Sequence, residues 1–184
     1  MLVKMNKHLI YRWTNIGFTL VEILVCLSIV VILMSMALPS FYRLIEKQRL
    51  KITVAEFYAA INLTRAEAIK RSAQVSLIPN DRKNWQSGWK IVVEADGRDD
   101  VDVILFSHEA LAEGFLITHN FTDASQTYIS YAGQGQSRTY LSSQQPLAGT
   151  VSMTLGENTK RIKVNFLGRA RICEPTYDLT CSDS

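Results

Sequence analysis

Residues 17–38 read GFTLVEILVCLSIVVILMSMAL and form an apolar stretch that one carboxylate, Glu22, interrupts. As an α-helix, the part from Phe18 to Leu38 would span roughly 30 Å, the thickness of the hydrocarbon core of a membrane. The segment before it contains Lys4, Lys7 and Arg12 and no acid. Because positive charge stays on the cytoplasmic side, this order predicts one membrane pass with the N-terminus in the cytoplasm and the rest exported. A cleaved secretory signal would have a shorter apolar region.

Glu22 is the unusual residue of this stretch. An acidic side chain within a membrane helix costs a few kcal/mol, so such residues tend to have a specific partner. The alternative is that Glu22 lies near the start of the helix and reaches the water between the lipid headgroups.

The order Gly17-Phe18-Thr19-Leu20-Val21-Glu22, after a basic leader and before an apolar helix, resembles the processing and assembly signature of type IV pilins and pseudopilins. The resemblance implies a leader over residues 1–17, which a prepilin peptidase removes by cleavage between Gly17 and Phe18. It also implies N-methylation of Phe18 and pairing of Glu22 with the N-terminal amine of a neighbouring subunit in a filament. The pairing is physically reasonable, because each charge relieves the desolvation of the other in a low-dielectric bundle.

A second helical segment is expected after the membrane segment, residues 18–39. From residue 40 to residue 73 the apolar residues recur on one stripe only, as in a helix that packs against a globular head. The stripe consists of Leu50, Val54, Phe57, Ile61 and Ala68. We therefore expect one helix from Phe18 to about Ala73, kinked at Pro39. The stripe lasts too few heptads for a long coiled coil.

The remaining residues, 74–184, show the shorter period of β-strands, separated by turn-forming pieces. The expected strands are Gln74–Ile78, Trp89–Glu94, Asp102–Phe106, Phe115–His119, Thr127–Tyr131, Thr150–Leu155, Arg161–Phe166 and Ala170–Cys173. The expected turns include Asn80–Asn84 and Asp96–Asp99. Together with the helix they predict an α+β fold, in which an antiparallel β-sheet head packs on the long N-terminal helix. This is the type IV pilin fold that the resemblance implies.

Two stretches of the head indicate which group of pilins the chain resembles. Residues 84–93, NWQSGWKIVV, and residues 161–173, RIKVNFLGRARIC, resemble the GspH/FimT group of minor pilins and pseudopilins. With the N-terminal signature, the resemblance covers most of the chain.

The charge of the chain is unevenly distributed. The full sequence has a formal net charge of +3, with 20 Lys and Arg against 17 Asp and Glu, and removing the three bases of the leader brings the net charge to zero. Residues 94–123 hold eight acids and one base, whereas residues 138–171 hold six bases and one acid. Overall attraction to a polyanion is therefore not expected, but the head should be electrically polarised.

The basic C-terminal segment is the candidate DNA site. Its residues are Gly168, Arg169 and Arg171, with Lys160, Arg161 and Lys163 before them. The two arginines of the G-R-x-R element would lie on one face of an extended segment, and a glycine would allow close approach of the backbone. This element resembles the C-terminal motif of the FimT branch, whose members are associated with DNA capture in natural transformation.

Binding of DNA would be directed to its backbone and not to its sequence. No recognition helix and no zinc-finger pattern is visible, and the basic segment has few aromatic residues for base stacking. About four phosphate contacts would give a salt slope near −3.6. The alternative is that these charges solvate an edge strand or pair with acids on the next subunit of a filament.

The cysteines suggest one disulfide. Cys173 and Cys181 lie in the segment that would be exported to an oxidising compartment, with Pro175 and turn-forming residues between them, and we expect them to be bonded. Cys26 lies in the membrane segment, where it is expected to act as a small apolar residue.

Enzymatic activity, a metal and a cofactor are not expected. The three histidines, His8, His108 and His119, fall in no ligand spacing. The glycines of residues 132–136 lack the Lys-Ser/Thr of a phosphate-binding loop, and no serine has an identifiable base partner.

The sequence thus predicts a minor type IV pilin that binds DNA. It would be a single-pass protein of a bacterial inner membrane, with its head in the periplasm, before it joins a pilus. Its partners would be other major and minor pilins, the prepilin peptidase, the inner membrane and DNA. Two alternatives remain: a structural minor pilin of the FimU kind that primes pilus assembly without binding DNA, and a pseudopilin of a type II secretion system.

Overall fold

The structure is a computed structural model of the 184-residue chain, and it describes residues 17–93, 103–124, 127–139 and 145–181. Most of the expected leader and the expected turn at Asp96–Asp99 lie outside these residues, as do Glu94 and Asp102 at the ends of two expected strands.

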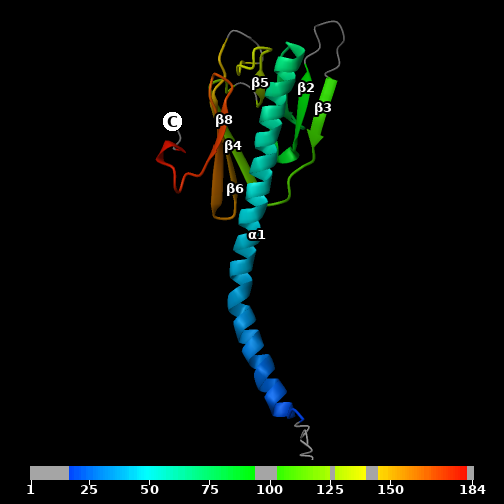
Figure 1. Ribbon diagram of the computed structural model, residues 1–184, viewed down its shortest axis with the longest axis vertical. Coiled ribbons are helices and arrows are strands. Elements are labelled where there is room, and N and C mark those ends of the chain that lie inside the picture. Colours follow the sequence, from blue (N-terminus) through cyan, green and yellow to red (C-terminus); the bar gives the residue numbers. More distant parts are fainter. Residues whose placement is uncertain (1–16, 94–102, 125–126, 140–144, 182–184) are drawn as a thin grey trace, which may run out of the picture. The chain divides into compact units, whose positions relative to one another are not determined.

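One long helix precedes eight strands (Figure 1). Helix α1 comprises Leu20–Arg71 and runs through Pro39 without a break. The strands are β1 (Val75–Pro79), β2 (Trp89–Val93), β3 (Val103–His108), β4 (Phe115–Phe121), β5 (Ile129–Tyr131), β6 (Gly149–Leu155), β7 (Asn158–Val164) and β8 (Ala170–Cys173). Two short 3₁₀ turns, η1 (Trp85–Ser87) and η2 (Leu179–Cys181), complete the described elements. All eight expected strands are present, with ends shifted by up to three residues.

The helix ends where its backbone leaves the helical conformation. Ser72 has a φ of 52°, in the left-handed region, and the N–H of Ala73 donates to the carbonyl of Ala68 (3.3 Å). This hydrogen-bond pattern is typical of a helix C-cap. The helix therefore ends two residues before the expected end at Ala73.

The strands form two sheets, whereas the sequence suggested one. The first sheet has the order β3-β2-β1-β5 and the second the order β4-β6-β7-β8, with all neighbours antiparallel. The division occurs between β3 and β4. There the chain does not turn back as a hairpin but passes η1, where the N–H of Leu111 donates to the carbonyl of Gln86 (3.0 Å). Strand β4 then pairs along its whole length with β6.

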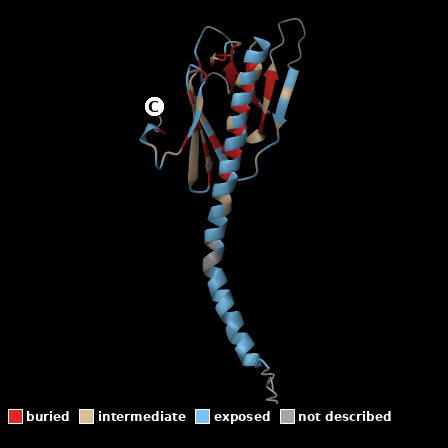
Figure 2. Cartoon of the chain, in the orientation of Figure 1, coloured by how far each residue is buried: buried red, intermediate tan, exposed pale blue. Residues whose placement is uncertain are grey.

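The head, which we define as Tyr42–Ser184, is one compact unit with a single core. The expected stripe of α1 is buried in it, from Leu50 to Ala68. Phe57 makes edge-to-face contacts with Trp85 and Trp89, with both ring centroids at 5.0 Å. Figure 2 shows the buried residues concentrated in the head, on the strands and the adjoining part of α1. The amphipathic pattern of the sequence is confirmed.

The exposed stretch of α1, which we define as Leu20–Met34, has no such core. Its large apolar side chains are all exposed (Figure 2). Helix α1, to which this stretch belongs, is long and apolar enough to cross a membrane. Residues up to Phe41 belong to a separate unit from the head.

Candidate functional site

The start of α1 contains the residues expected to act in assembly. Thr19 precedes the helix, and its hydroxyl accepts a hydrogen bond from the N–H of Glu22 (3.2 Å). Glu22 lies in the first helical turn, where a carboxylate also interacts favourably with the helix dipole. The pair has the T-x-x-E pattern of a capping box. Glu22 and Phe18 are exposed, so both are accessible to a partner.

The second candidate site lies on the β7–β8 hairpin. Lys163 on β7 stands directly opposite Arg171 on β8 in the strand register. Ile162 and Val164, on the other face of β7, are buried in the core. Because alternate residues of a strand point to opposite faces, the core fixes the orientation of the two basic side chains, which point away from it.

A tight turn joins these two strands and leads to Arg169. The side-chain oxygen of Asn165 accepts hydrogen bonds from the N–H groups of Leu167 (3.1 Å) and Arg169 (2.9 Å). The carbonyl of Asn165 accepts a third, from the N–H of Gly168 (2.8 Å). One side chain thus fixes the backbone of the whole turn.

Gly168 is required by the packing of the turn within the protein. Its φ is +78°, and a Cβ atom built there would lie 2.3 Å from the carbonyl oxygen of Gly135. The close approach expected at this glycine is therefore an approach of two loops of the same chain. Any other residue would separate them.

Arg65 of α1 anchors both loops. Its Nε donates to the carbonyl of Gly135 (2.8 Å), and its Nη2 donates to the carbonyl of Leu167 (3.4 Å). The helix therefore fixes the turn that presents Arg169.

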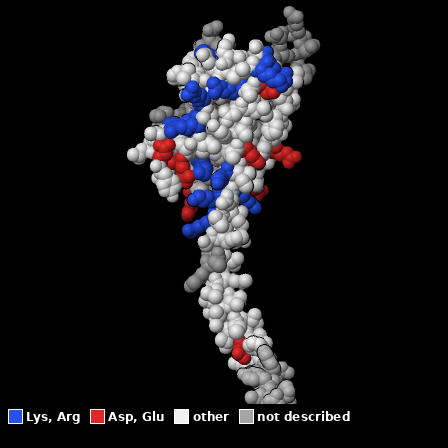
Figure 3. Space-filling view, viewed as in Figure 1, with Lys and Arg blue, Asp and Glu red and all other residues white. Residues whose placement is uncertain are grey.

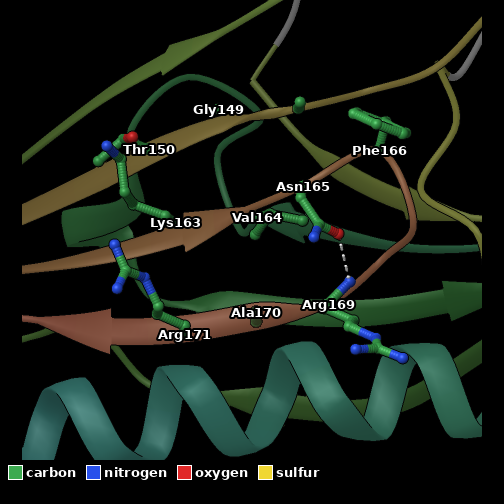
Figure 4. Close-up of a pocket in the computed structure, with 10 residues that line it drawn as sticks. Gly149, Thr150, Lys163, Val164, Asn165, Phe166, Arg169, Ala170 and Arg171 are labelled. Atoms are coloured by element: carbon green, nitrogen blue, oxygen red, sulfur yellow. Dashed lines mark hydrogen bonds between the residues drawn. The ribbon is translucent and has the colours of Figure 1, made fainter. Parts of the chain in front are cut away.

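Three basic side chains line one open pocket at this hairpin (Figure 4). The pocket has a volume of about 520 Å³ and is lined by Ala148, Gly149, Thr150, Lys163, Val164, Asn165, Phe166, Arg169, Ala170 and Arg171. We call it the basic pocket. Its lining contains no Asp or Glu. Figure 4 shows Phe166 and Arg169 at the turn, with Lys163 and Arg171 farther along the strands.

The C-terminal loop, Glu174–Cys181, contacts two of these bases. Arg171 Nη2 donates to the backbone oxygen (3.2 Å) and to Oγ1 (2.8 Å) of Thr180, and Arg171 Nη1 lies 3.5 Å from Asp178 Oδ2. Lys163 Nζ donates to the backbone oxygen of Thr180 (3.1 Å). Hydrogen bonds from Thr180 lower the pKa of Asp178 from its ordinary value of 3.8, with smaller contributions from Arg171 and Lys163. Figure 3 shows acidic side chains beside basic ones on the head.

A disulfide closes this loop. Cys173 at the end of β8 is bonded to Cys181, as expected from the sequence. The bond ties η2 to the hairpin, and with it the oxygen atoms that Lys163 and Arg171 contact. Cys26 is a free cysteine, as expected.

The basic residues expected to act together divide into two groups. Lys163, Arg169 and Arg171 share the basic pocket, but Lys160 and Arg161 do not line it. Lys160 Nζ forms an ion pair with Glu174 Oε2 (2.7 Å). Arg161 Nη1 donates to the carbonyl of Cys181 (2.6 Å). Arg169 is exposed, and its guanidinium has no partner among the described residues.

Sequence reasoning missed the residues that support the pocket. Asn165 could have been found from its position in the N-x-x-G turn between two expected strands. Arg65 and Thr180 act through contacts that are distant in the sequence, and no local pattern indicates them.

No metal site was found among the residues that the structure describes. There, no group of three or more His, Cys, Asp or Glu side chains could hold a metal ion.

Two family models match the chain. The model "Type II transport protein GspH" matches residues 53–168, and the model "Prokaryotic N-terminal methylation motif" matches residues 15–38. The second match contains Gly17, Phe18 and Glu22. No curated protein matches the chain in sequence.

Solved structures share the fold. The chain is similar to the type IV minor pilin FimU of Pseudomonas aeruginosa, with 17% identity and a TM-score of 0.56 over 71% of this chain and 92% of that one. It is also similar to the minor pseudopilin EpsH from the Type 2 Secretion System of Vibrio cholerae. That match has 14% identity and a TM-score of 0.51, over 69% of this chain and 98% of the other.

The fold and the methylation motif define a minor type IV pilin or pseudopilin, with a long N-terminal helix packed on antiparallel sheets. This class consists of structural proteins and not of enzymes. The chain belongs to the GspH family, whose model matches more than half of it.

Proposed function

We propose that this protein is a minor type IV pilin that joins a pilus through the exposed stretch of α1 and captures DNA through its basic pocket for uptake in natural transformation. The observation that carries the proposal is the basic pocket itself, which is lined by Lys163, Arg169 and Arg171 and by no Asp or Glu, although Asp178 lies 3.5 Å from Arg171. Lys160 and Arg161 are left out of the proposed site because they do not line the pocket.

Processing and location form the first part of the proposal. A prepilin peptidase cleaves between Gly17 and Phe18, and Phe18 is then N-methylated. The protein is held in the bacterial inner membrane with its head in the periplasm until it enters the filament. The match to the N-terminal methylation motif and the exposed apolar side chains of α1 support this part.

Assembly with other pilins depends on Glu22. Its carboxylate pairs with the N-terminal amine of a neighbouring subunit, because both charges would otherwise be desolvated alone. The hydrogen bond between Thr19 and the N–H of Glu22 supports this role, since it fixes the first turn from which the carboxylate projects.

In this proposal DNA is bound by three cations, which differ in the contacts that they already make within the protein. Arg169 is exposed and has no partner among the described residues, so it can contact a phosphate without losing an existing interaction. Arg171 and Lys163 already donate to Thr180, and Arg171 also pairs with Asp178, so both must exchange or share these contacts. Three phosphate contacts give a salt slope of about −2.7, so affinity falls about 40-fold between 50 and 200 mM salt.

A DNA titration of the mature chain in detergent micelles, at these two salt concentrations, tests the proposal. We expect weak binding that falls with salt, and the Arg169→Gln variant should bind more weakly, with a salt slope smaller by about 0.9. Lys51→Gln is the matched control, because Lys51 is an exposed base of the head outside the pocket. Equal losses in the two variants would indicate nonspecific attraction. No binding by the unchanged protein would refute DNA capture.

A second candidate function has one observation in its favour. The hydrogen bonds from Lys163 and Arg171 to the C-terminal loop are also expected if these side chains serve only to stabilise the hairpin. A structural minor pilin or a secretion pseudopilin would then use Arg169 to contact an acid of the next subunit. In that case, the Arg169→Gln variant would lose incorporation into filaments and would not change in DNA binding.

A further inference from the structure

We infer that the basic pocket prefers single-stranded nucleic acid, with the ring of Phe166 as a stacking surface for one base. The inference rests on the proposed function, and it concerns which form of nucleic acid the same site takes. The basic segment has few aromatic residues. The structure brings one of them, Phe166, into the lining of the pocket that Arg169 also lines.

The ring of Phe166 is available for contact. The residue is 59% exposed, although phenylalanine is usually buried. It lies at the same end of the pocket as Arg169, while Lys163 and Arg171 lie at the other end (Figure 4). An aromatic face next to cations along a groove is the combination by which proteins bind single strands without reading their sequence.

The backbone that carries the ring is fixed before any ligand binds. Asn165 accepts hydrogen bonds from the N–H groups on both sides of Gly168, at Leu167 and Arg169. Arg65 holds the carbonyl of Leu167 from the helix. A ring on a fixed turn loses little conformational freedom on binding, which favours affinity.

The two forms of DNA differ in what they offer to this ring. In a duplex the faces of each base are covered by its neighbours in the stack, so Phe166 has no base face to stack on. In a single strand the bases can turn outward and present a face. The cations therefore attract both forms, whereas Phe166 strengthens binding of the single strand alone.

A comparison of two probes with the mature chain in detergent micelles tests this inference. The probes are a fluorescein-labelled single strand of about 20 nucleotides of mixed sequence and the duplex of the same sequence, both measured by fluorescence anisotropy. For Phe166→Ala we expect a Kd about tenfold higher for the single strand, corresponding to roughly 1.4 kcal/mol of stacking. The Kd for the duplex should remain unchanged.

Two further variants control for folding and for loss of apolar surface. Leu167→Ala is the matched control, because Leu167 is 48% exposed on the same turn but does not line the pocket. It should leave both Kd values unchanged. Phe166→Trp keeps an aromatic face and should retain the affinity for the single strand.

The possible outcomes separate the two proposals. A selective loss for the single strand in Phe166→Ala, with retention in Phe166→Trp, supports the inference. Equal losses for both probes, or no loss for either, overturn the stacking role and leave DNA capture intact. If neither probe binds the unchanged protein, DNA capture itself fails, and the inference fails with it.

Discussion

The exposed stretch of α1 and the head differ in where their apolar side chains find partners. In the head, Leu50, Phe57 and Ile61 of α1 are fully buried against residues of the same chain. In the exposed stretch, large apolar residues are exposed on every side of the helix, for example Leu27 and Ile29, which lie on nearly opposite sides. The comparison teaches that one helix can serve two environments. The head completes its own core, and the exposed stretch requires a lipid or another subunit.

The largest effect is expected at the centre of the head. Phe57→Ala should lower the free energy of unfolding by about 3–5 kcal/mol, because it removes a buried ring packed on two tryptophans. Urea unfolding followed by tryptophan fluorescence measures this directly, since Trp85 and Trp89 are the only tryptophans after the leader. An unchanged midpoint would mean that the head does not depend on this core.

The next largest effect is expected at the disulfide. Replacing Cys173 and Cys181 together with alanine should lower the free energy of unfolding by about 2.5 kcal/mol, because the bond closes a short loop in the unfolded chain. The same urea experiment measures it. Cys26→Ala is the control, because Cys26 is exposed and free, and it should have no effect. Reduced protein should behave like the double variant.

A smaller effect is expected from pH at the C-terminal loop. The pKa of Asp178 is lowered mainly by hydrogen bonds from Thr180. A lowered carboxyl pKa means that the stabilisation is complete above the ordinary value of 3.8 and is lost as the pH falls through the lower folded-state value. The N–H of Thr180 donates to Asp178 (2.9 Å). Hydrogen exchange at this N–H should therefore accelerate when the pH falls below the folded-state pKa of Asp178.

Asp178→Asn serves as the control for this pH effect. The variant cannot ionise at this position, so exchange at Thr180 should show no pH step beyond the intrinsic one. A step of the same size in the variant would assign the effect to another group, for example Asp81, whose pKa is also lowered.

The smallest effect on stability is expected in the exposed stretch. Leu27→Ala should leave the urea midpoint of the head unchanged, because Leu27 is 56% exposed and contributes nothing to the core. Its effect should appear instead in incorporation into filaments, measured by immunoblotting of sheared pili. A loss of head stability comparable to that of Phe57→Ala would contradict the comparison.

Much of the fold could be predicted because its signals are local. The stripe from Leu50 to Ala68 indicated which face of α1 is buried, and the runs of strand-forming residues between turns indicated the position of each strand within three residues. The division into two sheets could not be predicted. It depends on the pairing of β4 with β6, whose paired residues lie from 28 (Phe121 and Gly149) to 40 (Phe115 and Leu155) positions apart in the sequence, and no local pattern indicates that pairing.

The candidate site was predictable in part for the same reason. The pairing of Cys173 with Cys181 follows from two residues close in sequence, and the G-R-x-R element did locate two bases of the pocket. The sequence could not show that Lys160 and Arg161 lie outside the basic pocket, because their partners belong to the C-terminal loop. The conformation of that loop is decided by the disulfide and by Thr180.

The core of the head also has a consequence for biosynthesis. Phe57 shares its hydrophobic cluster with Ile162 and Val164, which are made about 100 residues later. At the usual rate of translation, the apolar stripe of α1 therefore waits about 5–20 s before its last partners emerge. The core of the head can therefore be completed only after β7 has been made, and until then the apolar stripe needs protection from aggregation.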